Sequence, residues 1–125
     1  MNESQFKPIT NMTDLQAVFK TAAKNHIPVL LDFSAKWCTA CVELERSVFK
    51  DDDVKSTMKK FIVLRLDLST MNPESVELAR QFNIAGPPMA IFFDDHGKVI
   101  DTRPIGNMDA KAFKALLETE LTATQ

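Results

Sequence analysis

The chain has 125 residues, of which 45% are hydrophobic, and it carries 15 basic and 17 acidic side chains. This composition indicates a single domain over residues 1–125 that can bury a core, and the nearly balanced charge, with no basic block, argues against nucleic acid or an anionic membrane as a partner. Apolar runs such as residues 27–31 and 61–64 are far shorter than the ~20 residues that span a bilayer, so we expect no direct membrane insertion.

The first five residues, Met-Asn-Glu-Ser-Gln, have neither the cationic nor the apolar region of a signal peptide. This predicts either a cytosolic protein or a domain cut from a larger precursor. The chain has only two cysteines, and the absence of a third suits an oxidising compartment, where a spare thiol would mispair.

The predicted elements of the first half are a helix, a strand and a second helix. A capping box at Thr13-x-x-Gln16, followed by apolar residues at helical spacing, predicts a helix that ends near Lys24. The segment of residues 29–33 is apolar except for Asp32 and does not alternate with polar residues, which predicts a strand that is covered on both faces. The helix that carries the cysteines is expected to continue to about Phe49.

The next predicted elements are a short helix, a strand and a third helix. Three aspartates at 51–53 cap a helix over residues 54–60, and a strand follows over residues 61–68. Asn72-Pro73 places a capping side chain before a proline at the first helical position, which predicts a helix through Phe82.

The chain is expected to end in a hairpin and a helix. Strands over residues 89–93 and 98–102 flank a turn at residues 94–97. Asp109 begins an amphipathic helix, and its apolar stripe comprises Phe113, Leu116, Leu117 and Leu121. The order of elements is therefore βαβ first and ββα last, with a helix between the halves.

Both cysteines lie in the segment Trp37-Cys38-Thr39-Ala40-Cys41, directly after the apolar strand. The free N–H groups and positive dipole end of a helix start stabilise a thiolate, which is the form that attacks a disulfide. Zinc needs four ligands, and the sequence has no second cysteine pair and no ligand spacing at its histidines. A structural disulfide here would close almost no loop. We therefore interpret the pair as a redox-active disulfide that needs no cofactor and no metal.

The two cysteines are expected to have different roles. Cys38 stands at the helix start, within reach of solvent, and is the predicted nucleophile. Cys41 lies one turn inside and is the predicted resolving thiol, which attacks the mixed disulfide. Trp37 is a hydrophobic plate beside the sulfur, part of the core, or both, and we favour the plate.

Asp32 interrupts the apolar strand six positions before Cys38. A buried carboxylate is costly, and desolvation should raise its pKa until it carries a proton near neutral pH. The alternative is an edge position at which Asp32 faces water. We favour the buried position, because a titratable group near a dithiol is typical of a functional site.

Glu45 is the polar member of the helix face formed by Cys41, Leu44, Glu45 and Val48. If this face packs inward, Glu45 lies one turn below Cys41 and near Asp32, and the two acids disfavour the thiolate of the dithiol. If the face lies at an edge, Glu45 is solvated. Both interpretations remain open from the residues alone.

The segment Gly86-Pro87-Pro88-Met89 precedes a predicted strand, where proline is unusual unless it makes a special turn. Either a cis bond or a trans Pro-Pro connector fits this sequence.

The strand with Asp32, the Cys38-x-x-Cys41 helix start and the proline before the hairpin resemble the thioredoxin superfamily over nearly the whole chain. The resemblance implies the thioredoxin fold, an α/β architecture whose central mixed β-sheet is flanked by helices. It also implies that Pro88 is the cis-proline facing the dithiol and that Asp32 is the family's buried acid. The expected substrate-binding surface comprises Trp37, Pro87, Pro88 and Gly106.

Cys-x-Ala-Cys with Glu45 four residues on, Phe49-x-Asp51, and Gly106-x-Met108-Asp109-Ala110 with Phe113 are similar to the C-terminal, periplasmic domains of the DsbD family of thiol:disulfide interchange proteins. The resemblance implies a monomeric domain of a bacterial inner-membrane protein that functions in the periplasm and in cytochrome c biogenesis. Such a domain takes electrons from the membrane-embedded domain of its parent and passes them to the N-terminal domain, which reduces protein disulfides.

Two other functions are compatible with the residues. One is a freestanding thioredoxin that a flavoprotein reductase reduces, and the other is a redox-silent binding module, against which the presence of both cysteines argues. The sequence also departs from the family at Pro87. The residue before the cis-proline normally offers an N–H and a C=O to a partner strand, and proline has no N–H.

Overall fold

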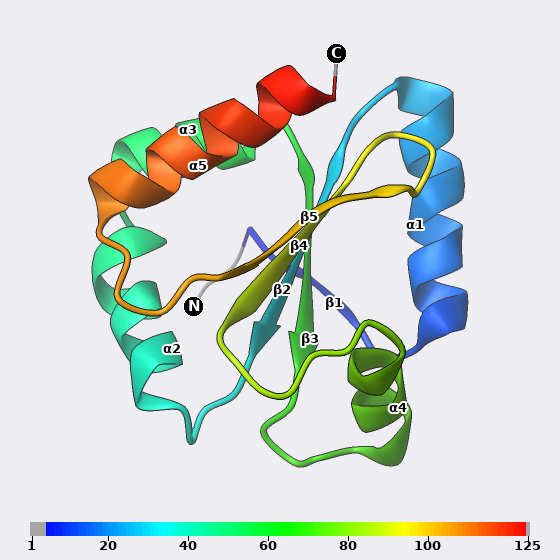
Figure 1. Cartoon of the computed structure of the whole chain (residues 1–125), viewed down its shortest axis with the longest axis horizontal. Coiled ribbons are helices and arrows are strands. Elements are labelled where there is room, and N and C mark those ends of the chain that lie inside the picture. The colour runs from blue at the N-terminus through cyan, green and yellow to red at the C-terminus, as the bar shows by residue number, and fades with distance from the viewer. Residues whose placement is uncertain (1–4, 125) are drawn as a thin grey trace.

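Five strands form one mixed sheet in the computed structural model, which describes residues 5–124 (Figure 1). The strand order is β1-β3-β2-β4-β5, in which β1 and β2 pair with β3 in parallel and the β2–β4 and β4–β5 pairs are antiparallel. The central mixed sheet of the expected thioredoxin fold is thereby confirmed. The strands are β1 (Lys7–Ile9), β2 (Val29–Ser34), β3 (Ile62–Asp67), β4 (Met89–Phe93) and β5 (Val99–Pro104).

Helices cover both faces of this sheet (Figure 1). Helices α1 and α4 lie on one side, and α2, α3 and α5 lie on the other. Helix α2 continues directly into a single π-helical turn, η1. The helical elements are α1 (Met12–Asn25), α2 (Thr39–Glu43), η1 (Leu44–Val48), α3 (Asp52–Met58), α4 (Pro73–Gln81) and α5 (Ala110–Ala123).

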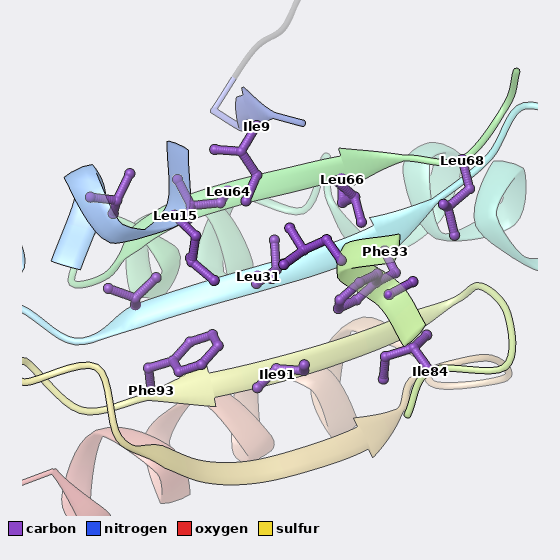
Figure 2. Close-up of a cluster of buried hydrophobic side chains, with 14 of the residues drawn as sticks. Ile9, Leu15, Leu31, Phe33, Leu64, Leu66, Leu68, Ile84, Ile91 and Phe93 are labelled. Atoms are coloured by element: carbon purple, nitrogen blue, oxygen red, sulfur yellow. The ribbon is translucent and has the colours of Figure 1, made fainter. Parts of the chain in front are cut away.

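The sheet separates two hydrophobic cores, because successive side chains of a strand point to opposite faces. On β2, Leu31 and Phe33 belong to the core under α1 and α4, which Figure 2 shows. Leu30 belongs to the core under α3 and α5. Asp32 follows Leu30 at the two-residue period, so it faces the side on which α2 begins.

The structure differs from the sequence analysis at two places in the N-terminal part. The sequence analysis did not predict β1, which is a three-residue edge strand. The capping box at Thr13 is wrong, because Asn11 caps α1 by accepting the N–H of Asp14, and Asp14 in turn accepts the N–H of Thr10. The helix therefore begins earlier, at the point where the chain leaves β1.

The other elements agree with the prediction within a few residues. Asn72 caps α4 with Pro73 in its first turn, and Asp109 caps α5. Helix α3 begins earlier than expected, because Asp51 caps it. On α5, Glu120 is buried at 3% exposure, whereas Leu121 of the predicted stripe is half-buried.

Within residues 5–124, no helix combines the length and the apolar composition that crossing a bilayer requires. Four of the five residues on which the signal-peptide expectation was based, residues 1–4, lie outside the described part of the chain.

Candidate active site

The dithiol lies at the junction of β2 and α2. Cys38 is the N-cap of α2, and its Sγ accepts a hydrogen bond from the N–H of Cys41 at 3.2 Å. Both thiols are free in this structure. Cys38 is 9% exposed and Cys41 is 3% exposed, so Cys38 is the more accessible of the two. The helix start thus directs one of its free N–H groups at the sulfur that the sequence assigns as the nucleophile.

Cys41 is placed so that it holds its proton. Burial raises the pKa of Cys41 to about 11, and its hydrogen bond with Cys38 acts in the same direction. Hydrogen bonds to the backbone of Ala35 and the side chain of Ser34 oppose the shift without cancelling it. A resolving reaction by Cys41 at neutral pH therefore needs a group that accepts its proton.

Asp32 is 2% exposed, so the buried position is confirmed and the edge position is wrong. Burial raises the pKa of Asp32 from 3.8 to about 6, and the charge of Glu45 adds to this effect. The charge and the hydrogen bond of Arg65 oppose it. At neutral pH, Asp32 is therefore mostly ionised yet close enough to its pKa to accept a proton.

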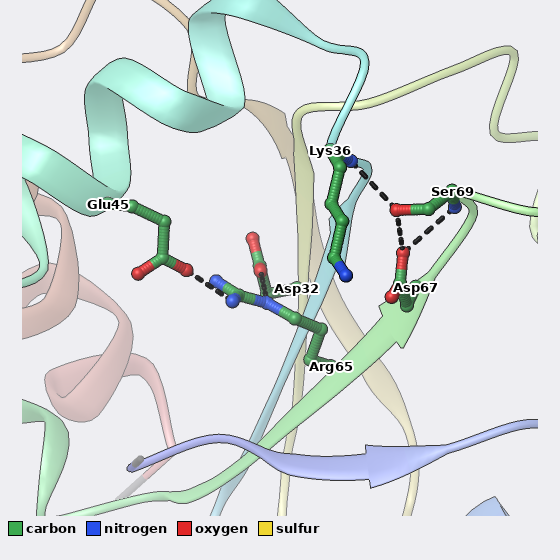
Figure 3. Close-up of polar contacts among 6 residues, drawn as sticks. All are labelled: Asp32, Lys36, Glu45, Arg65, Asp67 and Ser69. Atoms are coloured by element: carbon green, nitrogen blue, oxygen red, sulfur yellow. Dashed lines mark hydrogen bonds and ion pairs between the residues drawn. The ribbon is translucent and has the colours of Figure 1, made fainter. Parts of the chain in front are cut away.

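Arg65 is the site residue that the sequence analysis missed. It lies on β3 in register with Asp32 on β2, and its Nε donates to Asp32 Oδ2 at 2.7 Å. Its Nη1 donates to Glu45, so one guanidinium lies between the two carboxylates (Figure 3). A charged residue in the middle of the apolar segment Val63-Leu64-Arg65-Leu66 is the signal that could have identified it.

Glu45 lies on η1 with 43% of its side chain exposed. It is therefore partly solvated, as the edge interpretation expected, and also joined through Arg65 to Asp32, as the inward interpretation expected. The Arg65 guanidinium lies between the two acids and compensates part of their negative charge. That they disfavour the thiolate stays a prediction.

A cavity of about 250 Å³ lies between Cys41 and part of this charged cluster. Cys41 forms part of its wall, and so do Glu45 and Arg65. The volume is large enough to hold water beside the charged groups of the wall. The remaining lining residues are Ser34, Ala35, Lys36, Val42 and Asp67.

Trp37 is 58% exposed, so its placement in the core is wrong. Its indole N–H donates to the backbone oxygen of Ser69 at 3.2 Å, and the N–H of Lys36 donates to the hydroxyl of the same serine. The loop after β3 thus fixes the orientation of Trp37 at the surface. Its role as a plate beside the sulfur stays a prediction.

The Pro87-Pro88 peptide bond is cis, so the trans connector is wrong. A Cβ placed on Gly106 would lie 3.5 Å from Pro88 Cγ and 3.7 Å from Ala40 Cβ. The chain at Gly106 therefore packs between Pro88 and the first turn of α2. Pro88 and Gly106, which are distant in sequence, share the surface that carries the cysteines.

Among residues 5–124, no group of three or more histidine, cysteine, aspartate or glutamate side chains is arranged to hold a metal ion. The two histidines instead lie beside Asp95 in the hairpin turn, with ring nitrogens 3.4 Å and 3.6 Å from its carboxylate oxygens. The chemistry that this arrangement offers is exchange between thiols and disulfides.

The comparisons with known proteins agree with this geometry. A family model described as "Thioredoxin-like domain" matches residues 15–120. The thiol:disulfide interchange protein DsbD of Yersinia pestis is 37% identical over 121 residues, and DsbD of Citrobacter koseri is 38% identical over 114 residues. These alignments cover 96% and 90% of this chain and 20% of each relative, so the chain spans about a fifth of the length of these relatives.

Solved structures of thioredoxin-fold proteins also match this chain. The oxidised C-terminal domain of DsbD from Neisseria meningitidis matches with a TM-score of 0.75 and 26% identity, over 94% of this chain and 99% of that domain. A thioredoxin from Thermus thermophilus also matches with a TM-score of 0.75, over 97% of this chain and 91% of that one, but at 18% identity it shows the fold alone.

Proposed function

The chain belongs to the thioredoxin-like domain family, and we propose that it is the electron-relaying domain of a thiol:disulfide interchange protein of the DsbD type. The observation that carries this proposal is the free dithiol at the start of α2, with a buried acid on the strand behind it. The similarity to DsbD proteins over 96% of the chain supports the choice of this type.

The proposed reaction transfers two electrons to a partner disulfide. The Cys38 thiolate attacks one sulfur of that disulfide, and the other sulfur leaves as a thiolate. Cys41 then loses its proton and attacks Cys38 Sγ, which breaks the mixed disulfide. The products are the Cys38–Cys41 disulfide and a partner with two thiols. The protons of the original dithiol end on the partner, so the exchange needs no other reductant.

Asp32 has the properties of the proton acceptor for Cys41 in this scheme. A pKa of about 6 leaves it mostly ionised at neutral pH, and the pKa of Cys41 at about 11 makes such an acceptor necessary. A base acts best when its pKa lies close to the working pH.

The proposed partners are other domains of the same parent protein. Electrons would arrive from a membrane-embedded domain and leave to an N-terminal domain on the periplasmic side of a bacterial inner membrane, in support of processes such as cytochrome c biogenesis. The domain itself would be a monomer with no bound cofactor.

A direct test compares two reactions of the domain: electron transfer to the N-terminal domain of a DsbD-type protein, and insulin reduction driven by a thioredoxin reductase. We expect the reduced domain to reduce the oxidised N-terminal domain of a DsbD-type protein in stopped-flow fluorescence, and to support little insulin reduction when a flavoprotein thioredoxin reductase supplies the electrons. Efficient turnover with the reductase and no reaction with the N-terminal domain would instead identify a freestanding thioredoxin. No reaction with either partner would identify a binding module.

The absence of an N–H at position 87 is expected to weaken partner docking. Pro87→Leu restores the donor and keeps an apolar side chain, so it should tighten the non-covalent partner complex about fivefold, the value of one hydrogen bond of about 1 kcal/mol. Calorimetric titration of the partner into a Cys38→Ser, Cys41→Ser domain, which cannot form a mixed disulfide, measures this affinity with and without Pro87→Leu.

The control is Pro8→Leu. It changes an exposed proline on β1, which forms the edge of the sheet opposite β5. Equal affinity and an equal electron-transfer rate in Pro87→Leu and the parent domain would show that the missing donor has no role in specificity.

A further inference from the structure

Arg65 is the centre of a cluster that joins three elements behind the dithiol (Figure 3). It extends from β3, pairs with Asp32 on β2 and contacts Glu45 on η1. Its guanidinium carbon lies 3.8 Å from the centroid of the Phe6 ring and 5.8 Å from that of Phe49. With 22% of the side chain exposed, the cation is largely enclosed by these groups.

The charge of this cation favours the ionised form of Asp32 and so opposes the larger effect of burial on its pKa. Burial opposes the carboxylate form of Asp32, and Glu45 opposes it as well, whereas Arg65 favours it through both its charge and its hydrogen bond. Burial alone would lower the pKa of Arg65, but Asp32 and then Glu45 raise it, so the guanidinium keeps its proton. The cluster therefore contains a fixed positive charge next to an acid that can change its charge.

We propose that Arg65 is a positioning residue of the exchange reaction, whose guanidinium keeps Asp32 ionised and fixed behind Cys41, so that Asp32 can accept the Cys41 proton, while its second nitrogen ties this acid to Glu45. This inference rests on the proposed function.

The cavity beside Cys41 reaches the cluster at Arg65 and Glu45. Glu45 and Arg65 line it, and Glu45 is the partly exposed member of the cluster. Lys36 and Asp67 are the other charged residues on the cavity wall, and Cys38 is the remaining titratable group, hydrogen-bonded to the Cys41 backbone. Arg65 thus lies between the acid that receives the proton and the acid that faces solvent.

Lysine could serve only part of this role. An arginine presents several N–H donors in a planar fork, so that Nε binds one carboxylate while Nη1 binds the other. A lysine ammonium at this position would keep a positive charge near Asp32 but would not hold the two acids in a fixed geometry. Arg65→Lys and Arg65→Met therefore separate the charge from the geometry.

The first readout is the carboxyl ¹³C titration of Asp32 in the reduced protein, which requires no partner. In Arg65→Met the midpoint should rise by about one pH unit or more, the usual effect of losing an adjacent opposite charge. Arg65→Lys should lie between this variant and the parent. The matched control is Arg80→Met, which removes an exposed arginine that pairs with Glu77 on α4 and should leave the midpoint unchanged.

The second readout is the resolving step, followed in stopped-flow experiments as release of the second thionitrobenzoate when the reduced domain reacts with the disulfide reagent DTNB. Its pH profile should move upward in Arg65→Met by the same amount as the Asp32 midpoint. In an Asp32→Asn background, adding Arg65→Met should cause no further movement, because the acid that Arg65 acts on is gone.

An unchanged Asp32 midpoint in folded Arg65→Met would overturn the proposal, as would an equal movement of the profile in the Asp32→Asn background. If Arg65→Met does not fold, the same comparisons use Arg65→Lys, whose midpoint must then lie above that of the parent. A chain that reduces no protein disulfide but shows the expected Asp32 shift would contradict the proposed function and leave the electrostatic role of Arg65 supported.

Discussion

Cys38→Ser is expected to abolish disulfide reduction and to form no covalent complex with a partner, whereas Cys41→Ser is expected to accumulate a mixed disulfide. The reason is the geometry of the helix start, where Cys38 is the more exposed thiol and its sulfur accepts an N–H of α2. Cys41 is buried and its pKa is raised, so it reacts only with the adjacent Cys38 sulfur. Non-reducing electrophoresis after incubation with an oxidised partner measures the complex.

The expected contrast is large, because the nucleophile is required for every turnover whereas the resolving thiol is required only after the first attack. A Cys38→Ser, Cys41→Ser double variant controls for non-covalent association. A covalent complex that forms in Cys38→Ser and not in Cys41→Ser would reverse the assignment of the two thiols.

The dithiol and the acid behind it could be predicted because local sequence carries their signal. A cysteine pair after an apolar strand indicates a helix start, and an aspartate within such a strand is noticeable because burial of a carboxylate is costly. The hairpin and the capped helices α4 and α5 follow from turn and capping residues in the same way. These features depend on neighbours in the chain and not on the arrangement of the sheet.

Arg65 could not be placed because its partner depends on strand register. Asp32 and Arg65 face each other across parallel strands that are separated in sequence by a helix, a π turn and a further helix. A single arginine in a strand also fits an exposed position, so without the register it indicates no pairing. The edge strand β1 was missed for a similar reason, because three residues that include Pro8 give no strand signal of their own.

The position of Glu45 was only half predicted because η1 departs from the spacing of an α-helix. The N–H of Phe49 bonds to the oxygen of Leu44, five residues earlier, at 2.8 Å. A π turn widens the helix and changes the angle between successive side chains. The four-residue spacing from Cys41 placed Glu45 on the side of the helix that faces Arg65 but left its depth of burial open.

Asp32→Asn is expected to stabilise the domain at pH 8 by about 1–3 kcal/mol and to leave its stability near pH 4 almost unchanged. The folded-state pKa of Asp32, about 6, lies above the ordinary value of 3.8, so between these values the native state binds more protons than the unfolded state. Stability must then fall as the pH rises through this window. Asparagine keeps an oxygen that can accept the Arg65 N–H and removes the buried charge.

Urea unfolding at pH 4, 6 and 8 measures this difference, and Glu118→Gln, which neutralises an exposed acid on α5, is the control. The gain in Asp32→Asn should increase from pH 4 to pH 8, while the resolving step slows because the proton acceptor is missing. A gain of the same size at every pH would mean that Asp32 does not change its charge in this range. It could then not serve as the proton acceptor for Cys41, because an acceptor must bind and release a proton near the working pH.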